Sequence, residues 1–356
     1  MNSRQKTGKP ARRVTMSDIC RLAGGCHPST VSLALRNHPG ISEPVRTLIQ
    51  KIARKIGYRR DPLLDAFNLH RTQGAAHKDL PVIAFVTDFP TISSLGASPR
   101  HRALWQGATT AAQTLFHRVE FFSLTAGNMS AKRLDAVLRA RGINGMVVAA
   151  LRTDAKFLDF AWERFSTVKI GCGALEPPGY TVEAALLPGV RLALRHMYSL
   201  GYRHVGLVTM SGSETQRNDL LQAGVLCEHD RLPRAERVHP LILGSSAAAV
   251  RDWLSRFEVD AILAEQTPHQ QLISMIGRGR VKNLGWACTD VAGAASNVAG
   301  MVVDYEALGS VAVEQVVGLL RAHQRGFVRE VSTTFVPVAW RNGETLPTKT
   351  IVARIY

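Results

Sequence analysis

The sequence predicts an α+β multidomain chain, in which an all-α N-terminal domain and a linker precede a two-lobed α/β domain. Three observations support this fold class. Apolar residues recur at helical spacing in residues 15–58. From Leu80 onward, short apolar runs alternate with amphipathic stretches, a pattern typical of parallel sheets covered by helices. This second region holds roughly 265 residues, which suits two lobes better than one.

The composition is that of a folded chain with four parts. Hydrophobic residues make up 46% of the 356 residues and charged residues 20%, so a sizeable core can form. We expect residues 1–13 to be a disordered basic tail. Residues 14–58 then form the helical domain, and 59–79 a charged hinge with one short helical candidate at 62–69. Residues 80–347 form the two-lobed domain.

Three short helices account for the N-terminal domain. The first covers residues 17–23, with Thr15 as its N-cap, and stops at Gly24-Gly25. The second begins at Pro28, because a missing N–H costs nothing at the first helical position. The third covers residues 43–56, with Ser42 as its N-cap.

The strands of the α/β domain are predicted from apolar runs of three to six residues separated by amphipathic helices. Such runs occupy residues 82–86, 119–124, 145–150, 168–171, 205–209, 241–243, 261–264 and 284–287. The segment 331–340 is predicted to be one late strand.

The positive charge is concentrated near the N-terminus. The chain carries a formal net charge of +16. Residues 1–79 hold 15 lysines and arginines and five acidic residues, so +10 of that charge lies in less than a quarter of the chain. A surface of this kind attracts polyanions, nucleic acid first. We therefore expect the N-terminal part to bind the nucleic acid.

The five cysteines predict neither a disulfide framework nor a zinc module. None forms a Cys-x-x-Cys pair, and their number is odd, which favours small buried thiols in a reducing compartment. The basic N-terminus is not followed by an apolar run, and no apolar stretch is long enough to span a bilayer. The sequence therefore predicts a cytoplasmic protein without a membrane partner.

Residues 14–24 (VTMSDICRLAG) resemble the first helix of LacI/GalR-type repressors. Thr30-Val31-Ser32 and the following Leu35 and Pro39-Gly40-Ile41-Ser42 resemble the rest of that family's helix-turn-helix module, and Gly57-Tyr58 matches the end of its third helix. The matches cover roughly 45 residues at fixed spacing. One departure is the turn at residues 25–29, which holds one residue more than is usual in the family.

The resemblance implies a sequence-specific DNA-binding transcription regulator, expected to be a repressor, that is controlled by a small-molecule effector. It implies a periplasmic-binding-protein-like α/β domain with the effector between its lobes, and a pseudo-palindromic double-stranded operator. It also implies a homodimer or a tetramer of dimers. Because the tail after Trp340 lacks leucine heptads, we expect a dimer. No catalytic residue, metal or cofactor is expected.

The second helix carries the residues expected to read bases. In helix-turn-helix proteins its N-terminal residues face base edges in the major groove. Matched position by position, the base-edge candidates are Pro28, Ser29 and Leu33. His27 adds a hydrogen bond if the turn lets it reach. This set contains no Arg, Asn or Gln, so we expect weak direct reading.

Phosphate contacts are expected from Thr30, Ser32 and Arg36, which position the protein without reading sequence. For Thr30 and Ser32 the alternative is local capping and packing. Val31, Ala34 and Leu35 are expected in the core.

The hinge is expected to add specificity. Family hinges wedge an apolar residue into the minor groove, and counting from Tyr58 places this residue at Phe67. The alternatives are that Leu63 or Leu64 is the wedge, or that Phe67 packs in a dimer contact. Arg59 and Arg60 stand where backbone or narrow minor-groove contacts are made; the alternative is a solvated linker charge.

Two polar sugar anchors of the family are absent. An Arg of the family's R-x-x-G pattern corresponds to Leu221, and an Asp after a strand corresponds to Ala287. Possible replacements for effector binding are Trp105, Arg217, Trp286 and Asp290. Trp105 is expected on the first cleft-lining helix, and the alternative for Trp286, which lies beside a strand, is core packing.

Three rival classes follow from the same residues. An architectural DNA-binding protein without effector control fits the missing anchors. A solute-binding protein is disfavoured, because no secretion signal is expected in this sequence and the helix-turn-helix spacing would have to be chance. An enzyme is disfavoured because Gly171-Cys172-Gly173 does not extend to G-x-G-x-x-G, Glu176 standing at the last position, and no other catalytic motif is present. A change of operator affinity with a ligand distinguishes the regulator from the architectural protein.

Overall fold

The computed structural model describes residues 14–35, 40–58 and 80–349, with gaps at 128, 150, 152–156, 173–174, 211–214, 245, 282 and 327–330. The chain divides into a helical N-terminal unit and an α/β unit that begins at Pro81. The predicted fold class is confirmed: the N-terminal unit contains helices only, and the α/β unit contains two six-stranded sheets.

The N-terminal unit consists of α1 (Met16–Leu22), α2 (Pro28–Leu35) and α3 (Glu43–Lys55). Asp18 closes the start of α1, because its carboxylate accepts the backbone N–H of Thr15 at 2.9 Å. At the end of α3, the N–H of Tyr58 donates to the carbonyl of Ala53 at 3.0 Å, and Gly57 takes a left-handed φ of 70°. The three helices bury one small core, formed by Ile19, Cys20, Val31, Ala34, Ile49 and Ala53.

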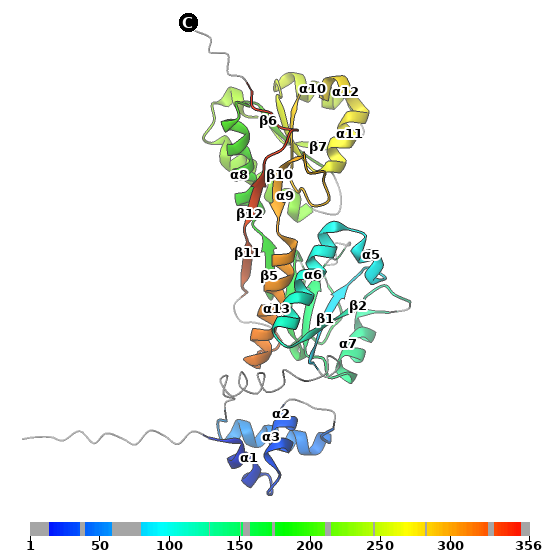
Figure 1. The fold of residues 1–356 in the computed structure, drawn as a ribbon, viewed down its shortest axis with the longest axis vertical. Coiled ribbons are helices and arrows are strands. Elements are labelled where there is room, and N and C mark those ends of the chain that lie inside the picture. Colours follow the sequence, from blue (N-terminus) through cyan, green and yellow to red (C-terminus); the bar gives the residue numbers. More distant parts are fainter. Residues whose placement is uncertain are drawn as a thin grey trace, which may run out of the picture. The chain divides into compact units, whose positions relative to one another are not determined.

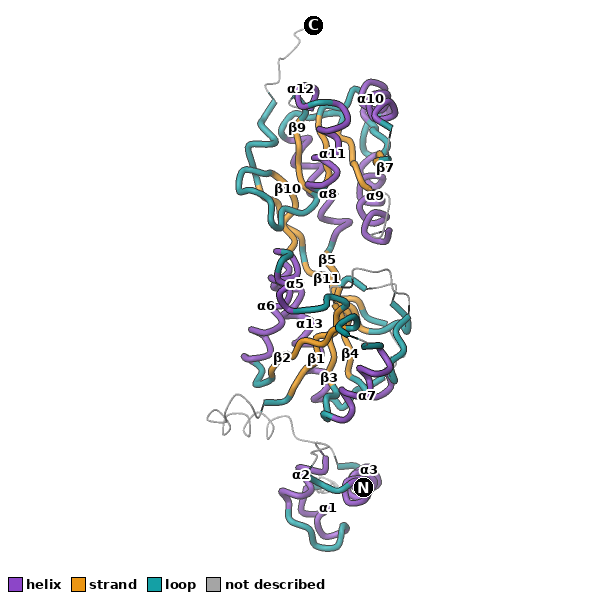
Figure 2. Tube along the Cα trace, turned by 90° about the vertical axis from the view of Figure 1, so that its right-hand side faces the viewer, coloured by secondary structure: helices purple, strands orange, loops and turns teal. Residues whose placement is uncertain are grey.

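The first lobe of the α/β unit is a parallel sheet of order β11-β5-β4-β3-β1-β2. Its strands are β1 (Val82–Thr87), β2 (Arg118–Ser123), β3 (Gly145–Ala149), β4 (Ser166–Ile170), β5 (Tyr180–Ala184) and β11 (Thr333–Val336). Its helices are α5 (Ile92–Gly96), α6 (Pro99–Thr114), α7 (Ala131–Ala140), η2 (Trp162–Arg164) and α13 (Tyr305–Arg321). Figure 2 shows the strands in orange with helices on both sides.

The second lobe is a sheet of order β12-β10-β9-β8-β6-β7, parallel except for its edge strand β12. Its strands are β6 (Val205–Met210), β7 (Leu241–Leu243), β8 (Ala261–Ala264), β9 (Gly285–Cys288), β10 (Ala299–Val303) and β12 (Val338–Arg341). Its helices are α8 (Leu186–Ser199), α9 (Thr215–His229), η3 (Arg234–Glu236), α10 (Ala247–Arg256), α11 (Gln266–Ile276) and α12 (Arg278–Val281).

The chain passes between the lobes three times. It leaves the first lobe between β5 and α8, returns between β10 and α13, and leaves again between β11 and β12. The predicted strand at 331–340 is therefore wrong as one strand: Pro337, which has no N–H to donate to a ladder, separates β11 from β12. Figure 1 shows these two strands in succession at the red end of the colour scale.

Two helices of the first lobe, α6 and α13, cross at very short range (Figure 1). A Cβ on Gly107 would lie 2.0 Å from the carbonyl oxygen of Glu306, and one on Gly309 would lie 2.1 Å from that of Leu104. Glycine at both positions lets the two backbones touch. This contact positions α6, whose first turn carries Arg100.

None of the helices in the described part of the chain is long and apolar enough to cross a membrane.

Candidate functional site

The amino-terminal end of α2 is open to solvent, while its other face is buried. His27 and Pro28 are exposed, whereas Val31 and Ala34 are fully buried in the helical core, as predicted. The first turn of α2 contains no acidic residue. The positive end of the helix dipole at this turn therefore favours an anion such as a phosphate.

The predicted DNA-contact residues on α2 lie along its accessible surface. Thr30, Ser32 and Leu33 are half-buried. Among the described residues of the N-terminal unit, five side chains are basic (Arg21, Arg46, Lys51, Arg54 and Lys55) and two are acidic (Asp18 and Glu43). Arg21 pairs with Asp18. The unit thus keeps the positive charge that a DNA backbone requires.

The turn before α2 accommodates its extra residue with two glycines. Helix α1 ends at Leu22, one residue earlier than predicted. Gly24 and Gly25 then take φ values of 88° and 86°, a left-handed conformation that other residues adopt only at a cost. The N–H of Gly25 donates to the carbonyl of Cys20 at 2.9 Å, which folds the turn back onto α1.

Several predicted contacts lie outside the described residues. These are Arg36, Arg59, Arg60 and Phe67, together with the side chain of Ser29. Their roles stay predictions.

The α/β unit contains a polar cluster that joins its two lobes. We call Arg100, Arg217, Glu265, Asp290 and Tyr305 the polar cluster. Arg100 lies in the first turn of α6 in the first lobe, while Glu265 and Asp290 follow β8 and β9 in the second. The Nε of Arg100 lies 2.8 Å from Oδ2 of Asp290, and its Nη2 lies 3.3 Å from Oε1 of Glu265. Arg100 therefore bridges the carboxyl edges of the two sheets.

The other two members complete the cluster from α9 and α13. Nη2 of Arg217 lies 3.2 Å from the same Oε1 of Glu265. The hydroxyl of Tyr305 donates to Oδ2 of Asp290 at 2.5 Å. Asp290 is held further by the N–H of Ala292, which donates to its Oδ1 at 2.9 Å. Its side chain has no exposed surface, so these donors replace the water that it loses.

Beneath the polar cluster, the sheet register brings two threonines beside Glu265. Val208 pairs with Ala264, and Leu263 pairs with Ala287. Continued by one position, the first register places Thr209 beside Glu265. Continued by two positions, the second places Glu265 beside Thr289, so the three residues form one row across the sheet. Both threonines are buried, at 4% and 1% exposure, and neither hydroxyl has a hydrogen-bond partner among the described residues. Buried hydroxyls without partners are uncommon in proteins and suit a polar ligand or water.

The electrostatics keep the cluster in one protonation state. Burial raises the pKa of Tyr305, and the negative charge of Asp290 raises it further. Burial opposes the charge of Arg217, but Tyr305 and Glu265 outweigh it and the pKa of Arg217 is raised. At neutral pH, Tyr305 therefore remains a hydrogen-bond donor and Arg217 remains a cation.

The polar cluster contains two of the four predicted effector residues, Arg217 and Asp290. Trp105 is not among them: it packs in the core of the first lobe, with its ring 5.2 Å from Phe85 and 6.2 Å from Phe121. The structure therefore gives no support for Trp105 as an effector contact.

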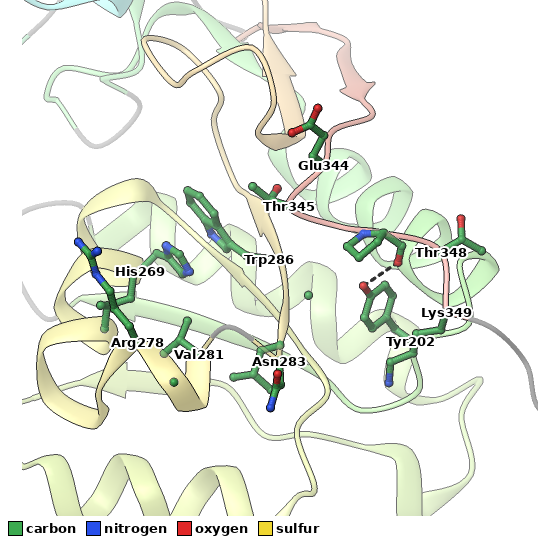
Figure 3. Close-up of a pocket in the computed structure, with 15 residues that line it drawn as sticks. Tyr202, His269, Arg278, Val281, Asn283, Trp286, Glu344, Thr345, Thr348 and Lys349 are labelled. Atoms are coloured by element: carbon green, nitrogen blue, oxygen red, sulfur yellow. Dashed lines mark hydrogen bonds between the residues drawn. The ribbon is translucent and has the colours of Figure 1, made fainter.

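Trp286 lines a separate cavity of about 790 Å³ in the second lobe. Its ring stacks on His269 at 3.7 Å, and Figure 3 shows both rings on one side of the cavity and Tyr202 on the other. Burial lowers the pKa of His269 to about 4, so the stacked pair is uncharged at neutral pH. None of the five residues of the polar cluster lines this cavity.

Sequence reasoning missed Arg100, Glu265 and Tyr305. Glu265 directly follows the predicted strand 261–264, and the carboxyl ends of parallel strands are where sites form, so this signal was available. Arg100 carries no local signal, because its partners lie 165 and 190 positions further along the chain. Among the described residues, no group of three His, Cys, Asp or Glu side chains could hold a metal ion.

A helix-turn-helix unit with the start of its second helix exposed, followed by a two-lobed α/β unit, is typical of DNA-binding transcription regulators. The comparison with protein families makes the assignment narrower. Residues 15–61 match the model of the bacterial regulatory proteins of the lacI family. The chain therefore carries the DNA-binding domain of the lacI family.

Solved structures share the fold over most of the chain. A transcriptional regulator CelR–cellobiose complex is 18% identical, with a TM-score of 0.53, and the match covers 94% of this chain and 100% of that one. The lac repressor dimer bound to operator and the anti-inducer ONPF is 16% identical, with a TM-score of 0.53 and the same coverage. A LacI family regulator from Enterococcus faecium with bound ribose is 14% identical, with a TM-score of 0.53. The match covers 76% of this chain and 100% of that one.

At these identities the likeness establishes the fold. The predicted periplasmic-binding-protein-like fold of the α/β unit is thereby confirmed. No curated protein matches the chain in sequence.

Proposed function

We propose that this protein is a repressor that binds a pseudo-palindromic operator as a homodimer and is controlled by a small polar effector. The observation that carries the proposal is the open amino-terminal end of α2. It has exposed His27 and Pro28 and a buried opposite face, within a segment that matches the lacI family. The regulators that share the fold include one bound to operator DNA.

Selection of bound DNA from a random pool tests the DNA-binding part of the proposal. The reduced full-length protein is used, and the selected fragment is titrated at several salt concentrations. A pseudo-palindrome with a central pyrimidine–purine step is expected, because a dimer reads two half-sites and a hinge wedge needs a step that unstacks easily. Equal binding of every sequence, with a steep salt dependence, would contradict sequence-specific reading.

For the effector, we propose the polar cluster and the row Thr209, Glu265 and Thr289 as the binding site. Two buried hydroxyls that have no partner among the described residues, together with charged groups from both lobes, can satisfy a ligand that presents several hydroxyls. Similar folds hold cellobiose and ribose. A ligand that contacts both edges would change how the lobes close, which is how effector binding would alter operator affinity.

Thermal unfolding with a panel of sugars, cellobiose and ribose included, tests the site. A ligand is expected to raise the melting temperature of the wild type. Arg217→Met and Thr289→Val should each lose this shift, whereas Trp286→Phe, which alters the separate cavity, should keep it. If only Trp286→Phe lost the shift in melting temperature, the effector site would be the cavity lined by Trp286.

The alternative function is an architectural DNA-binding protein, and one observation favours it. Arg100 already bridges Asp290 and Glu265, so groups that would hold a ligand are paired with each other. This alternative predicts that no member of the panel changes operator affinity, and that Arg100→Met does not create such a response.

A further inference from the structure

Two thiols lie on either side of the turn that leads into α2. Cys20, near the end of α1, is 7% exposed, and Cys26, two residues before Pro28, is partly exposed. Both pack against the same helical core. The N–H of Gly25 donates to the carbonyl of Cys20 at 2.9 Å, which folds the backbone next to Cys26 back against α1. No disulfide joins them, and both are free thiols.

The segment between the two cysteines can let their sulfurs approach further. A disulfide bond is about 2.05 Å long, so the turn must move to bring the two free sulfurs together. Gly24 and Gly25 lie between the cysteines, and apart from chain neighbours no heavy atom of the described residues lies within 4 Å of the Cβ position of either. The turn therefore has both the backbone freedom and the space for this movement.

We propose that Cys20 and Cys26 form a reversible oxidation site, at which an intramolecular disulfide weakens operator binding. The oxidant is a peroxide or a small disulfide. With hydrogen peroxide, the Cys26 sulfur attacks the O–O bond and becomes a sulfenic acid as the first water leaves. The Cys20 sulfur then displaces the hydroxyl of the sulfenic acid as the second water. Two thiols and one peroxide thus give one disulfide and two waters, and the thiols lose the two electrons that the peroxide gains.

The two thiols differ in burial, and this difference indicates which of them reacts first with the oxidant. Burial raises the pKa of the Cys20 thiol, and the neighbouring Cys26 sulfur adds to this effect. Thiolates are the reactive form, and access favours the more exposed sulfur. Cys26 is therefore the first to react, and Cys20 closes the disulfide.

The disulfide acts on DNA binding through the start of α2. Drawing Cys26 toward α1 also displaces His27 and Pro28, which open the helix and lie at its exposed end. Base contacts depend on sub-ångström placement of such side chains. We expect a loss of operator affinity of about tenfold or more, which corresponds to the loss of roughly one base contact.

Peptide mapping tests the bond without relying on DNA binding. Full-length protein is treated with hydrogen peroxide, remaining thiols are alkylated, and the chain is cut with trypsin. Trypsin cleaves after Arg21, which lies between the two cysteines, so the disulfide joins peptides 14–21 and 22–36. Linked peptides that disappear after dithiothreitol are expected. Their absence under conditions that already oxidise the exposed Cys227 would overturn the proposal.

Fluorescence anisotropy with the selected operator fragment tests the consequence. Peroxide should weaken wild-type binding about tenfold or more, and dithiothreitol should restore it. Cys26→Ser and Cys20→Ala should keep their own reduced-state affinity under peroxide, while Cys227→Ser should respond as the wild type does. Linked peptides with unchanged affinity, or an equal loss in Cys26→Ser, would contradict the proposed effect on DNA binding.

Discussion

Asp290 illustrates at the residue scale how a buried charge is maintained. Its carboxylate has no exposed surface and receives Arg100, the hydroxyl of Tyr305 and the N–H of Ala292. Each donor comes from a different segment, so the residue is satisfied only when the lobes and α13 are in place. A buried carboxylate with this many donors is costly to alter, because each donor would lose a charged acceptor.

Asp290→Asn should lower the free energy of unfolding by roughly 2 kcal/mol, because charged hydrogen bonds are replaced by weaker ones and Arg100 loses its closest partner. Urea denaturation followed by circular dichroism measures the change. Asp252→Asn, an exposed carboxylate on α10, is the matched control and should have almost no effect. An equal loss in both variants would indicate that the contacts of Asp290 are not responsible.

Residues of the candidate sites were predictable from sequence to unequal degrees. Asp290 and Arg217 could be identified because a predicted strand or helix near a family motif marks their place. Arg100 could not, since its role depends on the meeting of sheet edges that are distant in the chain. Val31 and Ala34 were assigned to the core correctly, because helical spacing alone determines which face of α2 is buried.

At the scale of elements, the close crossing of α6 and α13 holds Arg100 where it meets the second lobe. Gly107 and Gly309 permit the contact. Strong alternating or continuous apolar patterns predicted most strands, but β5 (YTVEA) and β10 (AGMVV) were missed. β5 mixes polar and half-buried residues, so it does not match the pattern of a buried strand. β10 is a short apolar run like the predicted strands, and its signal was available.

Gly107→Ala should destabilise the protein by about 3 kcal/mol, because its Cβ would lie 2.0 Å from the backbone oxygen of Glu306 and the helices must separate. Gly318→Ala is the control on α13, the helix that α6 crosses. A Cβ at this position would meet no atom of another described element within 4 Å, so the change should stabilise the protein by roughly 0.5–1 kcal/mol. Melting temperatures of both variants measure the two effects. A stable Gly107→Ala protein would contradict the close crossing.

The hinge is an element whose role rests on the sequence alone. Phe67→Ala should weaken binding to the selected operator by a few kcal/mol and leave binding to nonspecific DNA nearly unchanged, because a wedge acts only where the base step can unstack. Competition titrations with both DNAs measure the difference. An equal loss on both DNAs would remove Phe67 from the role of wedge.

For the whole molecule, we expect the free energy of unfolding to depend on pH through the half-buried His269. His269 has its pKa lowered to about 4 by burial, below the unfolded value of about 6.5. Above pH 6.5 the side chain is neutral in both states. Between pH 6.5 and 4 the unfolded chain takes up the proton first, so stability falls as the pH falls.

Replacing His269 by Phe keeps an aromatic ring on Trp286 and removes the titration. The melting temperature of His269→Phe should therefore fall less than that of the wild type between pH 7.5 and pH 5. Parallel thermal scans across this range measure the difference. Identical pH dependence of the two proteins would show that His269 does not contribute.

The three passages of the chain between the lobes have a consequence for biosynthesis. Strands β11 and β12 come last, and each completes a different sheet, with only Pro337 between them. Neither lobe can close its sheet until residues 333–341 have left the ribosome. A premature stop codon anywhere before β11 would leave both lobes with an exposed strand edge, so a truncated copy would be degraded or would aggregate as a whole. The helical unit, made first, could meanwhile fold on its nascent chain.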